Sequence, residues 1–268
     1  MTQAPASKAY AYGHLDVTVA IIAPPAAEVR AWLPQGLSLA PQTMTPPGTH
    51  PVTLMFGEHS HVRPWFMPPS AGGSYGEWIV ATPALDWNDD GGHGTSWAYM
   101  SRLFLSSPWF VFLGWLYAYP KVLARVAAPP GAYSVRTLIG NRPRVEMRWE
   151  SAGPVVPWAD FPGAARIAPA FEQPFISRFA PLPWLGSRMW FDLDHSSVQP
   201  VRAHFTLQAG SAPGLPAMRV DAGSIIDGLP GAFRLSCDWR LSRPYLASRL
   251  PGALRDLPAS DVRGPHHG

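Results

Sequence analysis

Short stretches of alternating apolar and polar residues run along most of this chain. Residues 14–23, HLDVTVAIIA, alternate at first and then become wholly apolar, which is typical of a β-strand. The next segment, 24–34, begins and ends with proline, and its pattern indicates one or two helical turns. The same reasoning predicts further strands over 50–62, 75–85, 94–106, 132–140, 144–151, 187–210 and 218–228.

Two segments lack such a pattern. Residues 158–184 are irregular, which suggests a loop covering the sheet, and the polar tail 258–268 is predicted to be disordered. No repeat or linker divides the remainder. We therefore expect residues 1–257 to form a single α+β domain, mostly antiparallel β-structure with a few helices.

Composition supports a folded chain that turns often. Hydrophobic residues make up 47% of the 268 residues and charged residues only 15%, and aromatic side chains, which disordered chains lack, reach 12%. The 32 prolines and 24 glycines favour many short strands over long helices.

Charge and cysteine content argue against several classes of protein. The net charge is +3, the basic residues are scattered, and the lysines are only Lys8 and Lys121, whereas a nucleic-acid binder needs a clustered basic face. The single Cys237 permits neither an internal disulfide nor an all-cysteine zinc site. Because no apolar run follows a charged start, no signal peptide is predicted and we expect a cytoplasmic protein.

One uncharged stretch, residues 103–119, approaches the length of a membrane span and is flanked by Arg102 and Lys121. Two serines, a proline and a glycine interrupt it, and no second such stretch exists. A buried segment of a soluble protein is therefore favoured over a membrane-associated one.

The histidines offer a possible metal site. Period-two alternation would place His59 and His61 on one face of a strand, where His93 or Glu58 could complete a ligand set. Such pairs occur by chance, so ordinary pocket or surface histidines are favoured and no metal is expected. The chain also lacks a G-x-S-x-G nucleophile elbow and the glycine-rich motifs of nucleotide binding.

Lys121 closes the most apolar stretch, LGWLYAYPKVLARV (113–126). It is either a solvated lysine that follows a helix or an amine that forms an imine. At the ordinary lysine pKa of about 10.4 the neutral nucleophile is scarce at pH 7, and desolvation lowers that pKa. Aromatic residues could supply a desolvating wall: Trp115, Tyr117 and Tyr119.

Several motifs together resemble the acetoacetate decarboxylase superfamily. Its signature, G-[FY]-P-K-K, is similar to AYPKV at 118–122. A strand with a glutamate after a tyrosine is similar to YGEWIVATP at 75–83, and a methionine-bearing strand to WAYMSRLFL at 97–105. The family's opening strand and helix, ending in L-x-P-x-G-L, resemble residues 19–39.

This resemblance implies a cone-shaped β-barrel with a buried cavity, a homo-oligomer, and a lysine that forms a Schiff base with a keto acid. By position, Lys121 would be that lysine and Glu77 the carboxylate that moves protons or orients the substrate. Tyr75, Met100 and Tyr119 would line the pocket. In this family, desolvation or a neighbouring cation activates the lysine.

The chain also departs from the family pattern. Val122 replaces the second lysine, and Gly114-Trp115-Leu116 stands where the family has G-R-E. The arginine of the first strand has no clear equivalent, and His14 is the nearest polar candidate. A replacement acid or carboxylate clamp could come from the second strand, through His59, His61 or Arg63.

These observations predict a lyase that acts on an oxo acid, by decarboxylation or related aldol or dehydratase chemistry. A small oxo acid or an aromatic compound is the expected ligand, with no cofactor, nucleic acid or membrane as partner. The alternative is a non-catalytic protein that uses the same barrel to hold a small apolar ligand.

Overall fold

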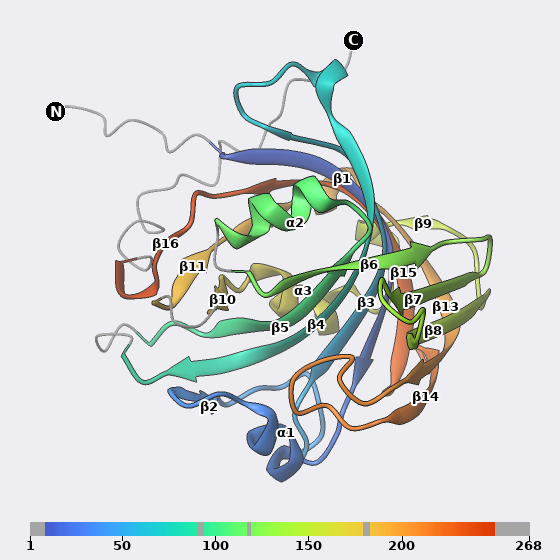
Figure 1. The fold of residues 1–268 in the computed structure, drawn as a ribbon. Coiled ribbons are helices and arrows are strands. Elements are labelled where there is room, and N and C mark those ends of the chain that lie inside the picture. Colours follow the sequence, from blue (N-terminus) through green and yellow to red (C-terminus); the bar gives the residue numbers. More distant parts are fainter. Residues whose placement is uncertain (1–8, 90–93, 117–118, 179–182, 250–268) are drawn as a thin grey trace, which may run out of the picture.

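A twisted, mostly antiparallel β-sheet that closes on itself organises the molecule (Figure 1). The computed structural model describes residues 9–89, 94–116, 119–178 and 183–249. Neighbouring strands run in the order β5-β6-β7-β8-β13-β15-β1-β3-β4, and pairing of β4 with β5 completes the ring. The predicted α+β class and barrel are confirmed.

The principal strands are β1 (Ala11–Ile22), β3 (Val52–Pro64), β4 (Gly73–Trp87), β5 (Trp97–Leu105), β6 (Lys121–Ala127), β7 (Ala132–Thr137), β8 (Pro143–Ser151), β13 (Ser197–Leu207), β14 (Met218–Ser224) and β15 (Gly231–Leu241). Shorter strands are β2 (Leu37–Leu39), β9 (Val156–Pro157), β10 (Phe175–Ser177), β11 (Leu185–Ser187), β12 (Met189–Phe191) and β16 (Tyr245–Leu246). The α-helices are α1 (Ala26–Trp32), α2 (Pro108–Trp115) and α3 (Ala164–Glu172).

Both faces of the central strands are buried, so two hydrophobic cores share one sheet. Along β1, Val17 and Val19 contribute to one core, whereas Ala20 and Ile22 contribute to the other. Such two-sided burial explains why residues 14–23 stop alternating and become wholly apolar. The core containing Ala20 and Ile22 fills the closed ring, with side chains from β3, β6, β7, β8 and β13.

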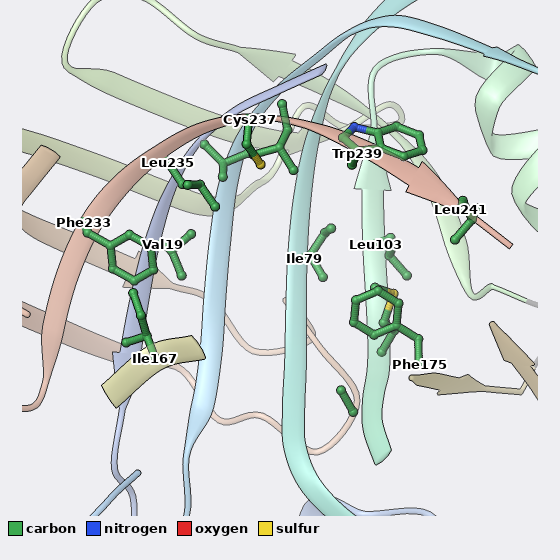
Figure 2. Close-up of a cluster of buried hydrophobic side chains, with 14 of the residues drawn as sticks. Val19, Ile79, Leu103, Ile167, Phe175, Phe233, Leu235, Cys237, Trp239 and Leu241 are labelled. Carbon is green, nitrogen blue, oxygen red and sulfur yellow. The ribbon is translucent and has the colours of Figure 1, made fainter. Parts of the chain in front are cut away.

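The second core lies on the other face of β1, β4, β5 and β15, beneath α3 and β10. Figure 2 shows Val19, Ile79 and Leu103 on the same side of these strands, facing Ile167 of α3 and Phe175 of β10. A side chain between the sheet and α3 is therefore buried, but it lies outside the closed ring. The candidate site residues described below project into this second core.

The strands predicted before residue 152 lie within a few residues of the observed ones, but three predictions need correction. The strand predicted over 187–210 is interrupted by a 3-10 turn at Leu193–His195, which separates the short β12 from β13. The segment 158–184 is not merely an irregular loop, since it contains α3 and β10. Its Pro169 lies inside α3 and obscured the helical pattern. The stretch 103–119 is divided between the buried end of β5 and the short helix α2. The expected burial is therefore wrong for its second half, where four apolar side chains are exposed: Trp109, Phe112, Trp115 and Leu116. Within the described residues no helix is long and apolar enough to span a membrane. The predicted tail 258–268 lies outside the described residues.

Candidate active site

Lys121 begins strand β6, and its side chain is only 11% exposed. Pro120 precedes it and separates it from α2, and β6 runs parallel to β5, with Lys121 paired to Leu103. The lysine is therefore not a solvated residue at the end of a helix. It enters the core from the edge where β6 joins the barrel.

Two residues of α2 define the space around Lys121. A β-carbon added at Gly114 would lie 2.1 Å from Lys121 Cδ, so only glycine leaves room for the lysine side chain. The Trp115 indole N–H donates to the Lys121 carbonyl oxygen over 2.9 Å. These residues stand where the family pattern has G-R-E, and here they position the lysine by shape and by a backbone hydrogen bond.

Glu77 of β4 is the acidic partner of Lys121. Its Oε1 lies 3.6 Å from Lys121 Nζ, an ion-pair distance, and its side chain is 4% exposed. Burial by itself raises the pKa of Glu77, but the Lys121 ammonium and the His59 ring outweigh it and hold the pKa below its ordinary value. The carboxylate is therefore charged at neutral pH and forms an ion pair with Lys121.

His59 of β3 completes a line of three polar side chains. Its Nε2 lies 3.1 Å from Glu77 Oε2, on the side of the carboxylate away from Lys121, and the His59 side chain is 3% exposed. The ring stacks on Tyr75, with centroids 5.0 Å apart and planes 9° apart. Within the described residues neither ring nitrogen has a well-directed hydrogen bond, so His59 retains capacity to bind a ligand or transfer a proton.

Tyr75 and Tyr119 flank the amine. Lys121 Nζ lies 5.6 Å from the Tyr75 ring centroid and 5.9 Å from that of Tyr119, and the Tyr119 hydroxyl hydrogen-bonds with Ser187. Burial, reinforced by the Glu77 carboxylate, raises the pKa of Tyr75, and burial also raises that of Tyr119. Both phenols are therefore neutral, and they surround the amine with aromatic surface.

These groups line one cavity of about 70 Å³. The three polar side chains, both tyrosines and Met100 share its wall with apolar residues from several strands: Leu15, Met55, Ile79, Leu103, Phe175, Met189, Phe191, Trp239 and Leu241. Among these described lining residues, Lys121 and His59 are the only basic ones. No arginine that could form a carboxylate clamp lies among the described residues of this wall.

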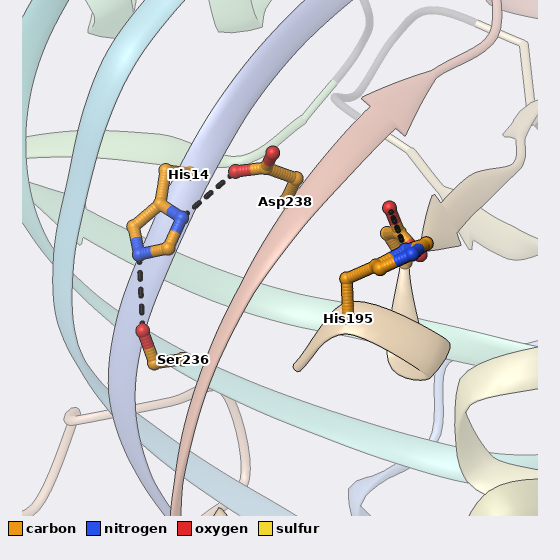
Figure 3. Close-up of polar contacts among 5 residues, drawn as sticks. His14, His195, Ser236 and Asp238 are labelled. Carbon is orange, nitrogen blue, oxygen red and sulfur yellow. Dashed lines mark hydrogen bonds and ion pairs between the residues drawn. The ribbon is translucent and has the colours of Figure 1, made fainter. Parts of the chain in front are cut away.

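Three predicted pocket residues lie elsewhere. His14 belongs to the face of β1 opposite Leu15, where its ring bonds Asp238 Oδ1 over 2.8 Å and Ser236 Oγ over 3.0 Å (Figure 3). Arg63 lies over the ring of Tyr12, 5.4 Å from its centroid. His61 is exposed and adopts a left-handed backbone with φ of 53°.

The expected common face for His59 and His61 is therefore wrong. The register of β3 with β4 shifts between His59 and Val62, and the irregular backbone at His61 breaks the alternation. Glu58 is exposed, and His93 lies outside the described residues. Within the part of the chain that is described, no three histidine, cysteine or acidic side chains cluster as a metal site would require.

The contribution of β15 to the cavity was not predicted from the sequence. Trp239 and Leu241 line it, and Trp239 meets His59 edge to face at 5.7 Å between ring centroids. The signal was present, because apolar and polar residues alternate strictly from Phe233 to Leu241. Met189 and Phe191 of β12 gave a weaker signal, since that strand has only three residues.

Comparison with solved structures identifies the fold as that of acetoacetate decarboxylase-like enzymes. Acetoacetate decarboxylase from Legionella pneumophila matches with a TM-score of 0.60 and 12% identity over 92% of this chain and 89% of that one. The enduracididine biosynthesis enzyme MppR complexed with pyruvate matches with a TM-score of 0.60 and 14% identity over 91% and 93% of the two chains. An acetoacetate decarboxylase-like enzyme from Sphingomonas wittichii gives a TM-score of 0.56 and 14% identity over 88% and 92%.

The resemblance drawn from the sequence motifs is thus confirmed at the level of the fold. No protein-family model matches the chain, and no curated protein matches it in sequence. Within this fold the chain is a divergent member.

Proposed function

We propose that this protein is a Schiff-base-forming lyase that acts on an oxo acid through Lys121. The observation that carries the proposal is the pairing of Lys121 with Glu77, 3.6 Å apart, inside an enclosed and largely apolar cavity. Burying a charged pair there costs desolvation free energy, and a lysine on the surface would stabilise the fold equally well. The position of Lys121 is therefore better explained by function than by stability. Perturbed ionisable groups gathered in a cleft are typical of catalytic sites.

The first step makes the amine nucleophilic. The Glu77 carboxylate accepts a proton from the Lys121 ammonium, and the freed amine attacks the carbonyl carbon of the substrate. The resulting carbinolamine has a C–N bond and a hydroxyl group. The proton held by Glu77 returns to that hydroxyl, which leaves as water, and a protonated imine remains.

The protonated imine then serves as an electron sink. When the carbon next to the imine carbon bears a carboxylate, the bond between that carbon and the carboxylate carbon breaks. Carbon dioxide leaves, and the electron pair of the broken bond forms an enamine. A proton from the solvent or from a cavity acid restores the imine, and water releases the ketone and the amine. Alternatively, loss of a proton from that neighbouring carbon forms the enamine, which can then add to the carbonyl carbon of an aldehyde.

His59 is the residue best positioned to help Glu77. Its Nε2 lies 3.1 Å from the second carboxylate oxygen, so a proton gained by Glu77 can pass to the imidazole, and a protonated imidazole offers a partner for a substrate oxygen. Two structural neighbours support oxo-acid chemistry: one is named as an acetoacetate decarboxylase and another is complexed with pyruvate.

Borohydride trapping tests the proposal. The protein is incubated in turn with acetoacetate, pyruvate and phenylpyruvate, reduced, and examined by intact mass and peptide mapping. We expect a reduced adduct on Lys121, none on Lys8, and no adduct in a Lys121→Met variant. If none of the three compounds modifies Lys121, the proposal fails and the alternative of a non-catalytic ligand-binding protein is favoured.

A further inference from the structure

A second cavity of about 60 Å³ adjoins the one that holds Lys121. It lies in the same core, between the sheet and α3. Its wall contains no ionisable side chain among the described residues: Val19, Ile21, Thr53, Met55, Ile79, Ala81, Pro83, Ala98, Met100, Ala170, Phe171, Phe175, Phe191 and Phe233.

The two cavities share part of their walls. The residues common to both are Met55, Ile79, Met100, Phe175 and Phe191. Methionine is unbranched and adapts its shape readily, so Met55 and Met100 can yield to a molecule that extends from one cavity into the other. A ligand bound at Lys121 therefore has an apolar continuation available to it.

Polarity is divided sharply between the two compartments. The first holds Lys121, Glu77 and His59 together with two tyrosine hydroxyls. Among its described lining residues the second offers almost only hydrocarbon, with the Thr53 side chain as the one polar exception. A charged group in the second cavity would lose its hydration without compensation, whereas an alkyl or aryl group would gain by leaving water. The pair of cavities fits a molecule with a carbonyl at one end and an apolar tail.

We propose that the substrate is a carbonyl compound with an extended alkyl or aryl tail, whose carbonyl carbon is attacked by Lys121 and whose tail occupies the second cavity. The attack forms a C–N bond and, after loss of water, an imine, as in the proposed function on which this inference rests. The tail, rather than a carboxylate clamp, then supplies most of the binding energy.

Chain length tests the proposal. Borohydride trapping on Lys121 is compared for acetone, methyl hexyl ketone and benzylacetone at limiting concentration. We expect the two longer ketones to modify Lys121 about tenfold or more efficiently than acetone, because each buried methylene adds to binding. Equal trapping of all three ketones would overturn the proposal.

A substitution that fills the second cavity supplies the matched test. Ala81 of β4 lines only that cavity, so Ala81→Leu should remove the preference for long ketones while acetone still modifies Lys121. Ala127→Leu, at the exposed end of β6, is the control and should keep the preference. Thermal unfolding of both variants checks that they are folded, and an unchanged preference in folded Ala81→Leu counts against the proposal.

A ligand that cannot form an imine separates this inference from the proposed function. Calorimetric titration with n-hexanol measures occupation of the tail cavity directly. Binding to the wild type that is lost in Ala81→Leu supports the tail cavity even if no ketone modifies Lys121, in which case only the imine chemistry fails. No binding of n-hexanol together with no chain-length preference refutes the tail cavity.

Discussion

Gly114 and Lys121 fit together so closely that the helix residue has no room for a side chain: a β-carbon at Gly114 would lie 2.1 Å from Lys121 Cδ and 2.7 Å from Cε. The distance is far below van der Waals contact, so one of the two must move. The Lys121 side chain can point into the cavity because residue 114 has no β-carbon.

We expect Gly114→Ala to reduce trapping of Lys121 by about a hundredfold, because displacement of a reacting atom by about 1 Å can cost that much. The rate of borohydride-dependent adduct formation measures the effect. Gly223→Ala is a suitable control, since the nearest atom to its added β-carbon would be 4.0 Å away. Trapping at the wild-type rate in a folded Gly114→Ala protein would show that the fit around the lysine is unimportant.

Removing the lysine should change how stability depends on pH. In the wild type the lowered pKa of Glu77 means that this residue stabilises the fold above the unfolded glutamate pKa of about 4.3, a contribution that is lost as the pH falls. In Lys121→Met, burial is opposed only by His59, so the Glu77 pKa rises and its charge destabilises the fold at neutral pH.

The difference in unfolding free energy between wild type and Lys121→Met should therefore be about 3–5 kcal/mol near pH 7 and should narrow towards pH 4. Urea titrations across this range measure it. A difference that is independent of pH would mean that the two side chains are not coupled as their 3.6 Å separation indicates.

Glu77→Gln keeps the size of the side chain and removes its ability to accept a proton. We expect turnover and trapping to fall by about 10²–10⁴, the usual contribution of a positioned base. Part of the loss should be recovered as the pH rises, because solvent hydroxide can then deprotonate the amine. A uniform loss at every pH would instead indicate that the carboxylate orients the lysine without transferring protons.

His59→Phe should separate stability from function. The two buried ring nitrogens lack well-directed hydrogen bonds among the described residues, and a phenyl ring can keep the stacking on Tyr75. Because the buried Glu77 carboxylate loses the imidazole that lies 3.1 Å from its Oε2, we expect the variant to be less stable by about 1–3 kcal/mol and slower in turnover. Thermal unfolding and adduct formation report the two effects, and a loss of stability with unchanged turnover would assign His59 to the core alone.

Most of the strands could be predicted from the sequence because each carries its own periodicity. The site could not be predicted from periodicity alone, since Glu77 and Lys121 come from different strands and no spacing rule brings them together. Only the resemblance to a family paired them, and their roles stand as proposals. His61 shows a limit of pattern reasoning, because one left-handed residue reversed the face that alternation assigned to it. The strand 231–241 was missed despite strict alternation, so that omission lay in the interpretation of the sequence.

The shared sheet also has a consequence for how this protein can change. Along β1, Leu15 borders the cavity of Lys121 and Val19 the apolar cavity beside it, while Ala20 and Ile22 pack inside the ring. Neighbouring positions on one strand therefore have different roles, since some line the cavities and others pack inside the barrel. Substitutions on the cavity side can reshape the choice of ligand while the alternate positions keep the barrel intact, so new specificities are accessible to this scaffold without a new fold.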